Sequence, residues 1–366
     1  MLFKNVYLRS FRLFLFPLAI LYGGIIRLRN YLYDKELIGS ISFNIPIIGV
    51  GNLSIGGTGK SPMVDYLATI LKDRYSIATL SRGYKRRTSG YLLANPSSTS
   101  IEIGDEPMQF HMAHPEIAVA VGEKRIEAVP QLLYDRPDTK VIILDDAFQH
   151  REIKSGLDIL LTDYSNLYTR DFFLPTGDLR DQKGNASKAH ILVVTKCPPD
   201  LTQEDRFRIM KELKPAAHQK IFFTSIQYDT PYHIVTKEKR KLSKQEEVLL
   251  ICGIANPEPL TEYIHEVTKT YDALFYSDHH IFSIDDLNDM QQRFEFISAE
   301  DKIYLTTEKD AVRLIKFQDR LNQLPFYVLP ISIFFLFDQT EEFNQLIVDY
   351  PIEFYKTQAA EQLPAN

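Results

Sequence analysis

The sequence contains two cysteines, Cys197 and Cys252, too few for a disulfide framework or a zinc site. Both lie near apolar runs, where a free cysteine packs as a small buried residue, so a reducing cytoplasm fits. The chain also lacks a basic surplus, and its net charge of −6 argues against a nucleic-acid partner. It has no internal repeat and no low-complexity tract, and no feature of the sequence calls for an obligate protein partner.

No acidic residue precedes Asp34, and basic residues bracket the apolar run from Leu13 to Ile26. This run is shorter than the roughly 20 residues that a helix needs to cross a bilayer. No small-x-small site follows it, as a cleaved signal peptide would require. We therefore expect residues 1–30 to form a membrane-interfacial helix on an anionic membrane surface. A buried core helix is the alternative.

The clearest functional signal is a glycine-rich turn between an apolar run and a helical pattern. Ile45 to Val50 is strand-like, and residues 54–61 read SIGGTGKS. In such a loop the backbone N–H groups converge on phosphate oxygens, a lysine neutralises the β/γ charge and a hydroxyl ligates Mg²⁺. Ser54 replaces the first glycine of the usual pattern, and a turn without nucleotide is the alternative. The pattern predicts a nucleoside triphosphate site made by Gly56, Gly57, Thr58, Gly59, Lys60 and Ser61.

Beyond this loop, β-rich runs alternate with helical stretches, which is typical of an α/β fold with a mainly parallel sheet flanked by helices. Ligands then gather at the carboxyl ends of the strands. A second, smaller α/β unit begins at Val248. We expect a membrane-associated segment at 1–30, a P-loop domain at 31–225, a connector at 226–246 and a C-terminal unit at 247–366 that closes over the cleft.

Two carboxylates, Asp145 and Asp146, follow the apolar run at 141–144. Such a strand end is typical of a Walker B site, in which an aspartate holds Mg²⁺ directly or through water. Together with the phosphate loop, the pair predicts a magnesium site, and an acidic loop start is the alternative. His150 lies just beyond and suits a contact with a phosphate or a sugar hydroxyl, or is a solvated loop histidine.

A second carboxylate pair, Asp105 and Glu106, lies where a loop ends and a helix begins. Asp105 either caps the helix or acts as the base that takes the proton of an acceptor hydroxyl. Basic residues at 81–87 and 174–181 suit an acceptor that carries its own phosphate, or form solvated faces. The adjacent histidines at 279–280 either lie on the surface or close over the site.

Jointly and in this order, the motifs resemble the tetraacyldisaccharide 4′-kinase family, the lipid A pathway kinases of Gram-negative bacteria. The similarity extends over most of the chain. The motifs that carry it read GNL at 51–53, GGTGKSP at 56–62, SRGY at 81–84, GDEP at 104–107, LDDAFQH at 144–150, LPTG at 174–177, VTKCP at 194–198, DHH at 278–280 and TEKD at 307–310.

The resemblance implies a kinase that uses ATP and Mg²⁺. It would transfer the γ-phosphate to the 4′-hydroxyl of a tetraacylated glucosamine disaccharide 1-phosphate, at the cytoplasmic face of the inner membrane. The resemblance makes Asp105 the catalytic aspartate, supported by His279 or, one place along, His280. Family members have Glu where Asp181 stands, so that carboxylate receives no role. The implied catalytic set is Asp105, Lys60, Asp146 and His279, the metal set is Ser61, Glu106, Asp145 and Asp146, and the acceptor set is Arg125, Gln149, His150 and Arg180.

The competing interpretation is a P-loop switch or partner-binding NTPase at the membrane. A GTPase would carry an [NT]-K-x-D motif, whose aspartate reads the guanine edge. Residues 195–198 read TKCP, with Pro198 in place of that aspartate. A membrane scaffold with a vestigial nucleotide fold is a third possibility, which the full metal set disfavours.

Overall fold

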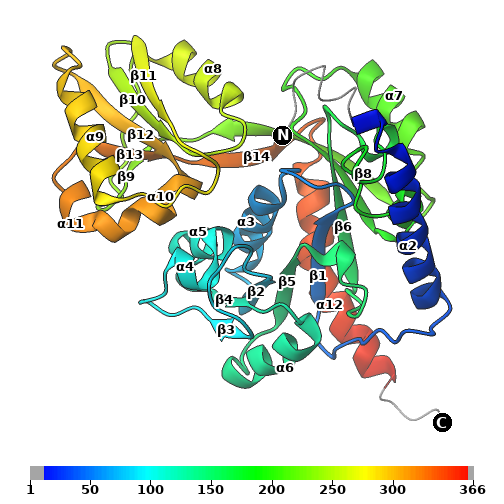
Figure 1. Ribbon diagram of the computed structural model, residues 1–366. Coiled ribbons are helices and arrows are strands. Elements are labelled where there is room, and N and C mark those ends of the chain that lie inside the picture. Colours follow the sequence, from blue (N-terminus) through cyan, green and yellow to red (C-terminus); the bar gives the residue numbers. More distant parts are fainter. Residues whose placement is uncertain (1–11, 362–366) are drawn as a thin grey trace.

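The computed structural model describes residues 12–361, which form two sheets side by side (Figure 1). The larger sheet has nine strands in the order β14-β8-β7-β6-β1-β5-β2-β4-β3. Its edge strands β14 and β3 pair antiparallel with their neighbours, and the strands between them run parallel. Its strands are β1 (Ile47–Asn52), β2 (Ile77–Ser81), β3 (Leu92–Leu93), β4 (Ala118–Val121), β5 (Val141–Asp145), β6 (Leu157–Asp163), β7 (Ile191–Thr195), β8 (Lys220–Tyr228) and β14 (Ile331–Phe335).

Helices cover both faces of this sheet, as continuous apolar strands require. Along β1, Ile48 faces a core closed by α3 and α12, whereas Ile47 faces the opposite core, which α6 closes. Helix α7 packs on a third cluster over β6, β7 and β8. The helices associated with this sheet are α2 (Phe16–Asp34), α3 (Lys60–Leu71), α4 (Ser100–Ile103), α5 (Asp105–Ala113), α6 (Arg125–Asp135), α7 (Gln203–Leu213) and α12 (Thr340–Glu361).

The smaller sheet has five strands in the order β11-β10-β12-β13-β9. Tyr304 anchors its core, because its ring stacks on Phe294 at 3.9 Å and on Phe326 at 5.0 Å between centroids. The other face packs against Leu260 and Ile264 of α8. Its elements are β9 (Tyr232–His233), β10 (Glu247–Cys252), α8 (Glu258–Val267), β11 (Thr270–Phe275), α9 (Ile284–Glu295), β12 (Lys302–Thr307), α10 (Glu308–Leu314), α11 (Gln318–Leu321) and β13 (Phe326–Leu329).

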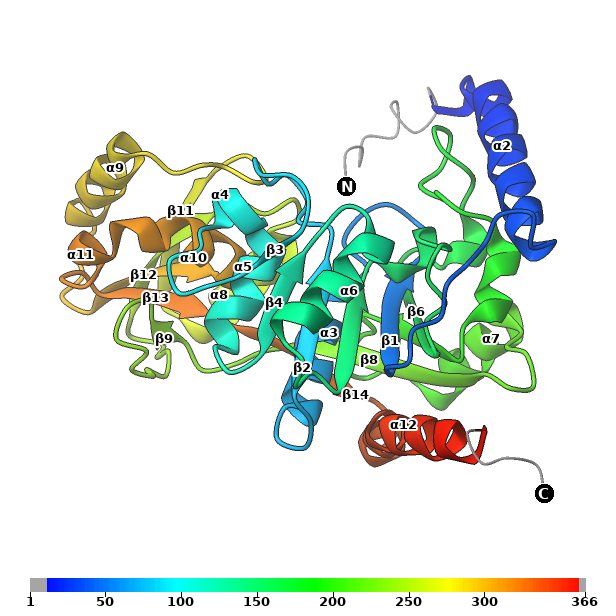
Figure 2. The ribbon, with the colours of Figure 1, turned by 90° about the horizontal axis from the view of Figure 1, so that it is seen from below.

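The predicted α/β fold with a mainly parallel sheet and a second, smaller sheet is confirmed. The last part of the chain differs from the expected C-terminal unit at 247–366. Strand β14 leaves the smaller sheet and pairs with β8, and α12 runs beneath the larger sheet against α3 (Figure 2). The physical reason is burial, since Phe343 and Ile347 of α12 complete the core over β1 and β5.

Helix α2 lies at the outer edge of the larger unit (Figures 1 and 2). One stripe of it is buried against the loop at 172–181, and Gly23 allows the close approach because a Cβ there would stand 2.7 Å from the Phe173 ring. Among the described residues, no helix has the length and apolar character needed to span a bilayer. Residues 1–11 of the expected interfacial segment lie outside the described part of the chain.

The packing of α12 gives a stability prediction. Phe343 is fully buried, with its ring 5.2 Å from Phe222 and 4.3 Å from Phe335 between centroids. Phe343→Ala should lower the free energy of unfolding by about 3–5 kcal/mol, because the cavity cannot refill. Ile352→Ala, at a residue of the same helix that is 43% exposed, is the control and should change it little. Equal losses in urea unfolding would show that α12 does not close this core.

Candidate active site

The phosphate loop lies beside the Asp145–Asp146 pair because β1 and β5 are neighbours. Their parallel register sets Val50 opposite Asp145, so the residues that follow both strands meet at one edge of the sheet. Gly56 has φ +105° and Gly59 has φ +85°, backbone conformations that favour glycine. Helix α3 begins at Lys60, directly after this turn.

Polar contacts hold the loop in place from beneath. The Asn52 side-chain amide donates to the Thr58 hydroxyl at 2.7 Å, and the Thr195 hydroxyl donates to the Thr58 carbonyl at 2.9 Å. Ser54, which replaces the first glycine of the usual pattern, is buried. Its backbone forms an isolated antiparallel β-bridge with Leu179. A side chain at position 54 is therefore accommodated without opening the loop.

Asp146 is the centre of the charge network at the loop. Its carboxylate lies 3.5 Å from the Lys60 ammonium and accepts a hydrogen bond of 3.1 Å from Arg180. Burial alone would raise the pKa of Asp146, but Lys60 and Arg180 outweigh burial and lower it. Asn52 adds an amide oxygen that accepts from both Lys60, at 3.4 Å, and Arg180. The two cations are thus held at the mouth of the phosphate loop.

Three of the expected metal residues, Ser61, Glu106 and Asp145, lie near the start of α3. The Ser61 hydroxyl donates to Glu106 at 2.9 Å, and the side chain of Asp145 is buried, with one oxygen lacking a hydrogen-bond partner among the described residues. Burial raises the pKa of Asp145, and the nearby Glu106 charge raises it further. Within residues 12–361 no three His, Cys, Asp or Glu side chains are placed so that they could hold a metal ion together. An orphaned buried carboxylate oxygen fits Mg²⁺, which takes few protein ligands and completes its shell with phosphate and water.

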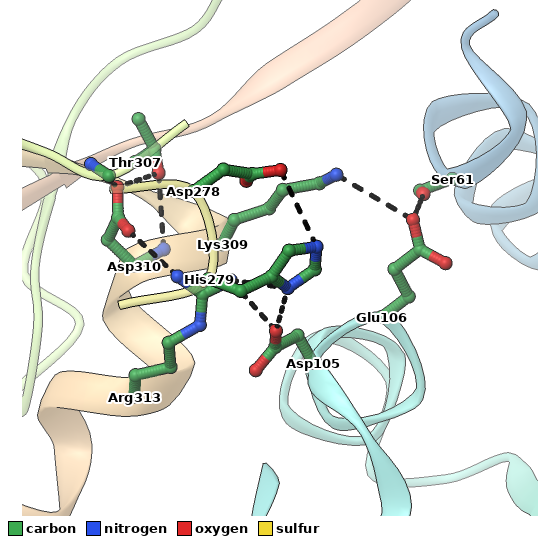
Figure 3. A network of polar contacts seen from close by, with 10 residues as sticks. Ser61, Asp105, Glu106, Asp278, His279, Thr307, Lys309, Asp310 and Arg313 are labelled. Carbon is green, nitrogen blue, oxygen red and sulfur yellow. Dashed lines mark hydrogen bonds and ion pairs between the residues drawn. The ribbon is translucent and has the colours of Figure 1, made fainter. Parts of the chain in front are cut away.

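Asp105 stands at the first position of α5 and faces the smaller unit (Figure 3). His279 Nδ1 lies 2.7 Å from Asp105 Oδ2. Burial would raise the pKa of Asp105, but hydrogen bonds from His279 and Arg313 outweigh burial and lower it to about 2. The carboxylate is therefore ionised at neutral pH. Because a contact this short requires a donor, the imidazole carries its hydrogen on Nδ1.

The structure distinguishes the two adjacent histidines. His279 occupies the left-handed region with φ +64°, which turns its ring toward Asp105. His280 points the other way and contacts Asp286 at 3.0 Å, beside the N-terminus of α9. His279 is therefore the residue that faces the expected base.

The sequence analysis assigned no role to Arg313 and Lys309, which extend from α10 to Asp105 and Glu106. Arg313 donates to Asp105 Oδ2 at 2.8 Å, and the Lys309 ammonium lies 3.6 Å from Glu106 (Figure 3). Asn52 belongs to the GNL motif at 51–53, and the sequence analysis assigned it no role. The TEKD motif at 307–310 was the available signal for α10, yet no sequence pattern shows that this helix faces α5.

Four residues, Arg125, Gln149, His150 and Arg180, are expected to contact the acceptor. Gln149 donates to the Asn52 carbonyl at 2.7 Å, and Arg180 lies beside it at the mouth of the phosphate loop. Burial and the charge of Arg125 lower the pKa of His150 to about 4, so its imidazole is neutral at pH 7. Arg125 is 1% exposed and bonded to the Gly122 and Asp145 carbonyls, so its contact with an acceptor stays a prediction.

Asp181, to which the family resemblance assigns no role, is buried and accepts hydrogen bonds that hold the structure together. It receives hydrogen bonds from Asn30 of α2 at 2.8 Å and from Asn185 at 2.9 Å. Arg29 donates to the Gln149 carbonyl, and the Tyr22 hydroxyl donates to the Arg180 carbonyl at 3.1 Å. Helix α2 is thereby fixed to the two loops that carry Gln149 and Arg180.

Comparisons with known proteins match one family over nearly the whole chain. The family described as tetraacyldisaccharide-1-P 4′-kinase matches residues 11–350. The chain is 45% identical to the tetraacyldisaccharide 4′-kinase of Flavobacterium johnsoniae, over 93% of this chain and 97% of that protein. It is 41% identical to that of Bacteroides thetaiotaomicron, over 92% of each. The crystal structure of LpxK from Aquifex aeolicus in complex with ATP superposes with a TM-score of 0.73, at 28% identity, over 93% of this chain and 99% of that one.

The charge network predicts the effect of removing the loop lysine. Lys60→Met should lower the rate of phosphoryl transfer by about 10²–10³, because a positioned cation is lost where charge develops. Lys72→Met is the control, since Lys72 follows the same helix but pairs with Glu116 at 2.6 Å on the surface. Turnover and thermal unfolding should be measured together. A folded Lys60→Met protein with normal turnover would remove the phosphate-loop assignment.

Proposed function

The chain belongs to the tetraacyldisaccharide-1-phosphate 4′-kinase family, and we propose which of its residues carry out the ATP-dependent transfer in lipid A biosynthesis. The observation that carries the proposal is the position of Asp105. Its carboxylate is the first residue of α5, and the next residue, Glu106, accepts from Ser61 of the phosphate loop. An acceptor bound at Asp105 therefore lies beside the end of a bound triphosphate.

Asp105 is the general base in this proposal. It takes the proton of the acceptor 4′-hydroxyl as the oxygen bonds to the γ-phosphorus and the bond to the β–γ bridging oxygen breaks, which leaves ADP. A carboxylate held at a pKa of about 2 is a weak base. Phosphoryl transfer passes through a loose transition state in most analyses, so orienting the hydroxyl matters more than early proton removal.

The phosphate loop holds the triphosphate in this proposal. The backbone N–H groups of residues 56–61 and the Lys60 ammonium contact its phosphates. Ser61, Glu106, Asp145 and Asp146 would hold Mg²⁺, which would neutralise charge on the phosphate oxygens. The unpartnered oxygen of Asp145 and the Ser61–Glu106 contact support this assignment.

The acceptor lies on the side of Arg180, Gln149 and His150. Arg180 supplies charge for the acceptor's own phosphate, and the neutral imidazole of His150 offers a hydrogen bond to a sugar hydroxyl. The contacts that fix α2 to these loops support an acceptor whose acyl chains extend toward α2. His279 acts through Asp105 by holding its carboxylate.

Removing the carboxylate charge tests the base. Asp105→Asn should lower kcat by about 10²–10⁴, the usual contribution of a positioned acid or base, with little change in ATP affinity. Asp286→Asn is the matched control, because it alters the second Asp–His pair of the smaller unit, at His280. If Asp105→Asn weakens ATP binding but keeps turnover at saturation, Asp105 is not the base.

We also propose that α2 lies in the headgroup region at the cytoplasmic face of the inner membrane. Its outward faces expose Leu18, Leu21, Ile25 and Leu28, each more than half exposed. A continuous apolar surface of this kind marks a membrane or partner contact. Arg27, which is exposed on the same helix, adds attraction of about 1 kcal/mol to anionic lipid. An enzyme that goes to the lipid avoids extracting acyl chains, at about 0.8 kcal/mol per methylene.

Replacing the exposed side chains of α2 tests this placement. The quadruple change Leu18, Leu21, Ile25 and Leu28 to Ser should release the protein from vesicles of anionic phospholipid. It should also raise KM for acceptor embedded in vesicles but not for acceptor dispersed in detergent. The control changes four exposed apolar residues on other surfaces to Ser, namely Phe207, Phe275, Ile284 and Phe296. Vesicle binding is measured by flotation. If the α2 variant floats with the vesicles as the parent does, the membrane contact lies elsewhere.

A further inference from the structure

Arg313 joins the smaller unit to the carboxylate that we assign as the base. It is on α10, and its guanidinium Nη2 donates to Asp105 Oδ2 at 2.8 Å. Both side chains are largely shielded, with 4% of the Arg313 side chain and 14% of the Asp105 side chain exposed. An ion pair this shielded is screened far less by salt than one on the surface.

A second carboxylate holds the arginine in position. Asp310, one turn earlier on α10, lies 3.3 Å from Arg313 Nη1. Asp310 is itself fixed, because it accepts from the Gly253 backbone N–H at 2.9 Å and from the Thr307 hydroxyl at 2.8 Å (Figure 3). The arginine therefore cannot swing away without leaving Asp310 buried and uncompensated.

Within residues 12–361, every side-chain hydrogen bond to Asp105 falls on the same oxygen. His279 and Arg313 both contact Oδ2, and their nitrogens lie 3.2 Å apart. Two donors on one oxygen fix the rotation of the carboxylate. They also leave Oδ1 without a side-chain hydrogen bond among the described residues.

We propose that Arg313 is a positioning residue that orients the Asp105 carboxylate so that Oδ1 meets the acceptor hydroxyl. This rests on the proposed role of Asp105 as the base. If His279 were the only partner, the carboxylate could still rotate about that single hydrogen bond. Arg313 adds a second direction, which holds the carboxylate plane in one orientation. The alternative is a purely structural ion pair that ties α10 to α5.

Arg313→Met tests the proposal through kcat and KM. Loss of orientation should lower kcat by about 10- to 100-fold, the cost of a misplaced reacting group, and leave KM for ATP unchanged. Arg313→Lys keeps the charge and should recover part of the rate.

A double-mutant cycle with Asp105→Asn separates positioning from structure. If Arg313 acts through Asp105, Arg313→Met should slow the parent enzyme but hardly slow the Asp105→Asn enzyme further. Arg240→Met is the control. It breaks another ion pair of the smaller unit, with Glu246 and with Asp301 at 2.6 Å, and should leave kcat unchanged. If Arg313→Met does not fold, Asp310→Asn releases the arginine and should lower kcat in the same way.

The outcomes separate the two proposals. Full activity of Asp105→Asn would overturn the assignment of the base itself. If Asp105→Asn is inactive but Arg313→Met keeps the parent kcat, the positioning role is overturned. Equal losses from Arg313→Met in both backgrounds would show that Arg313 acts independently of Asp105 and also overturn it.

Discussion

Parallel pairing of β1 with β5 is the constraint on which the site depends. It sets Val50 opposite Asp145, so the phosphate loop and the Asp145–Asp146 pair leave the sheet side by side. A slip of one residue would turn every side chain of a strand to the other face. The register is secured because both faces of β1 are buried, Ile47 in one core and Ile48 in the other. The position of the chemistry is thus a consequence of ordinary core packing.

Charges at the sheet edge are arranged as mutually neutralising pairs. Asp146 lies against both Lys60 and Arg180, and Glu106 lies against both Ser61 and Lys309. A bound triphosphate would compete with Asp146 for the two cations, which lowers the cost of desolvating them. The smaller unit contributes His279 and Arg313, which pair with Asp105 of the larger unit, so both units contribute charge to the site.

Much of the larger sheet could be predicted from the sequence, because its strands are apolar runs that end in functional residues. Asp145, Asp105 and the phosphate loop are local signals at strand and helix ends. The choice of His279 over His280 depends on one left-handed backbone conformation, which sequence does not reveal. Arg313 depends on α10 facing α5 across the two units, a long-range contact without local pattern. The return of β14 to β8 was missed for the same reason.

The smaller unit is inserted between β8 and β14, which are adjacent strands of the larger sheet. The core over β1 also needs α12, where the Tyr350 hydroxyl accepts from the Ile47 N–H at 3.3 Å and donates to the Ile47 carbonyl at 3.2 Å. During synthesis, the whole smaller sheet emerges before these residues do. Contacts of such long sequence separation close late, because loop closure must precede them. The first strand of the larger unit is translated before any of the smaller unit. The core of the larger unit is nevertheless the one that is completed last.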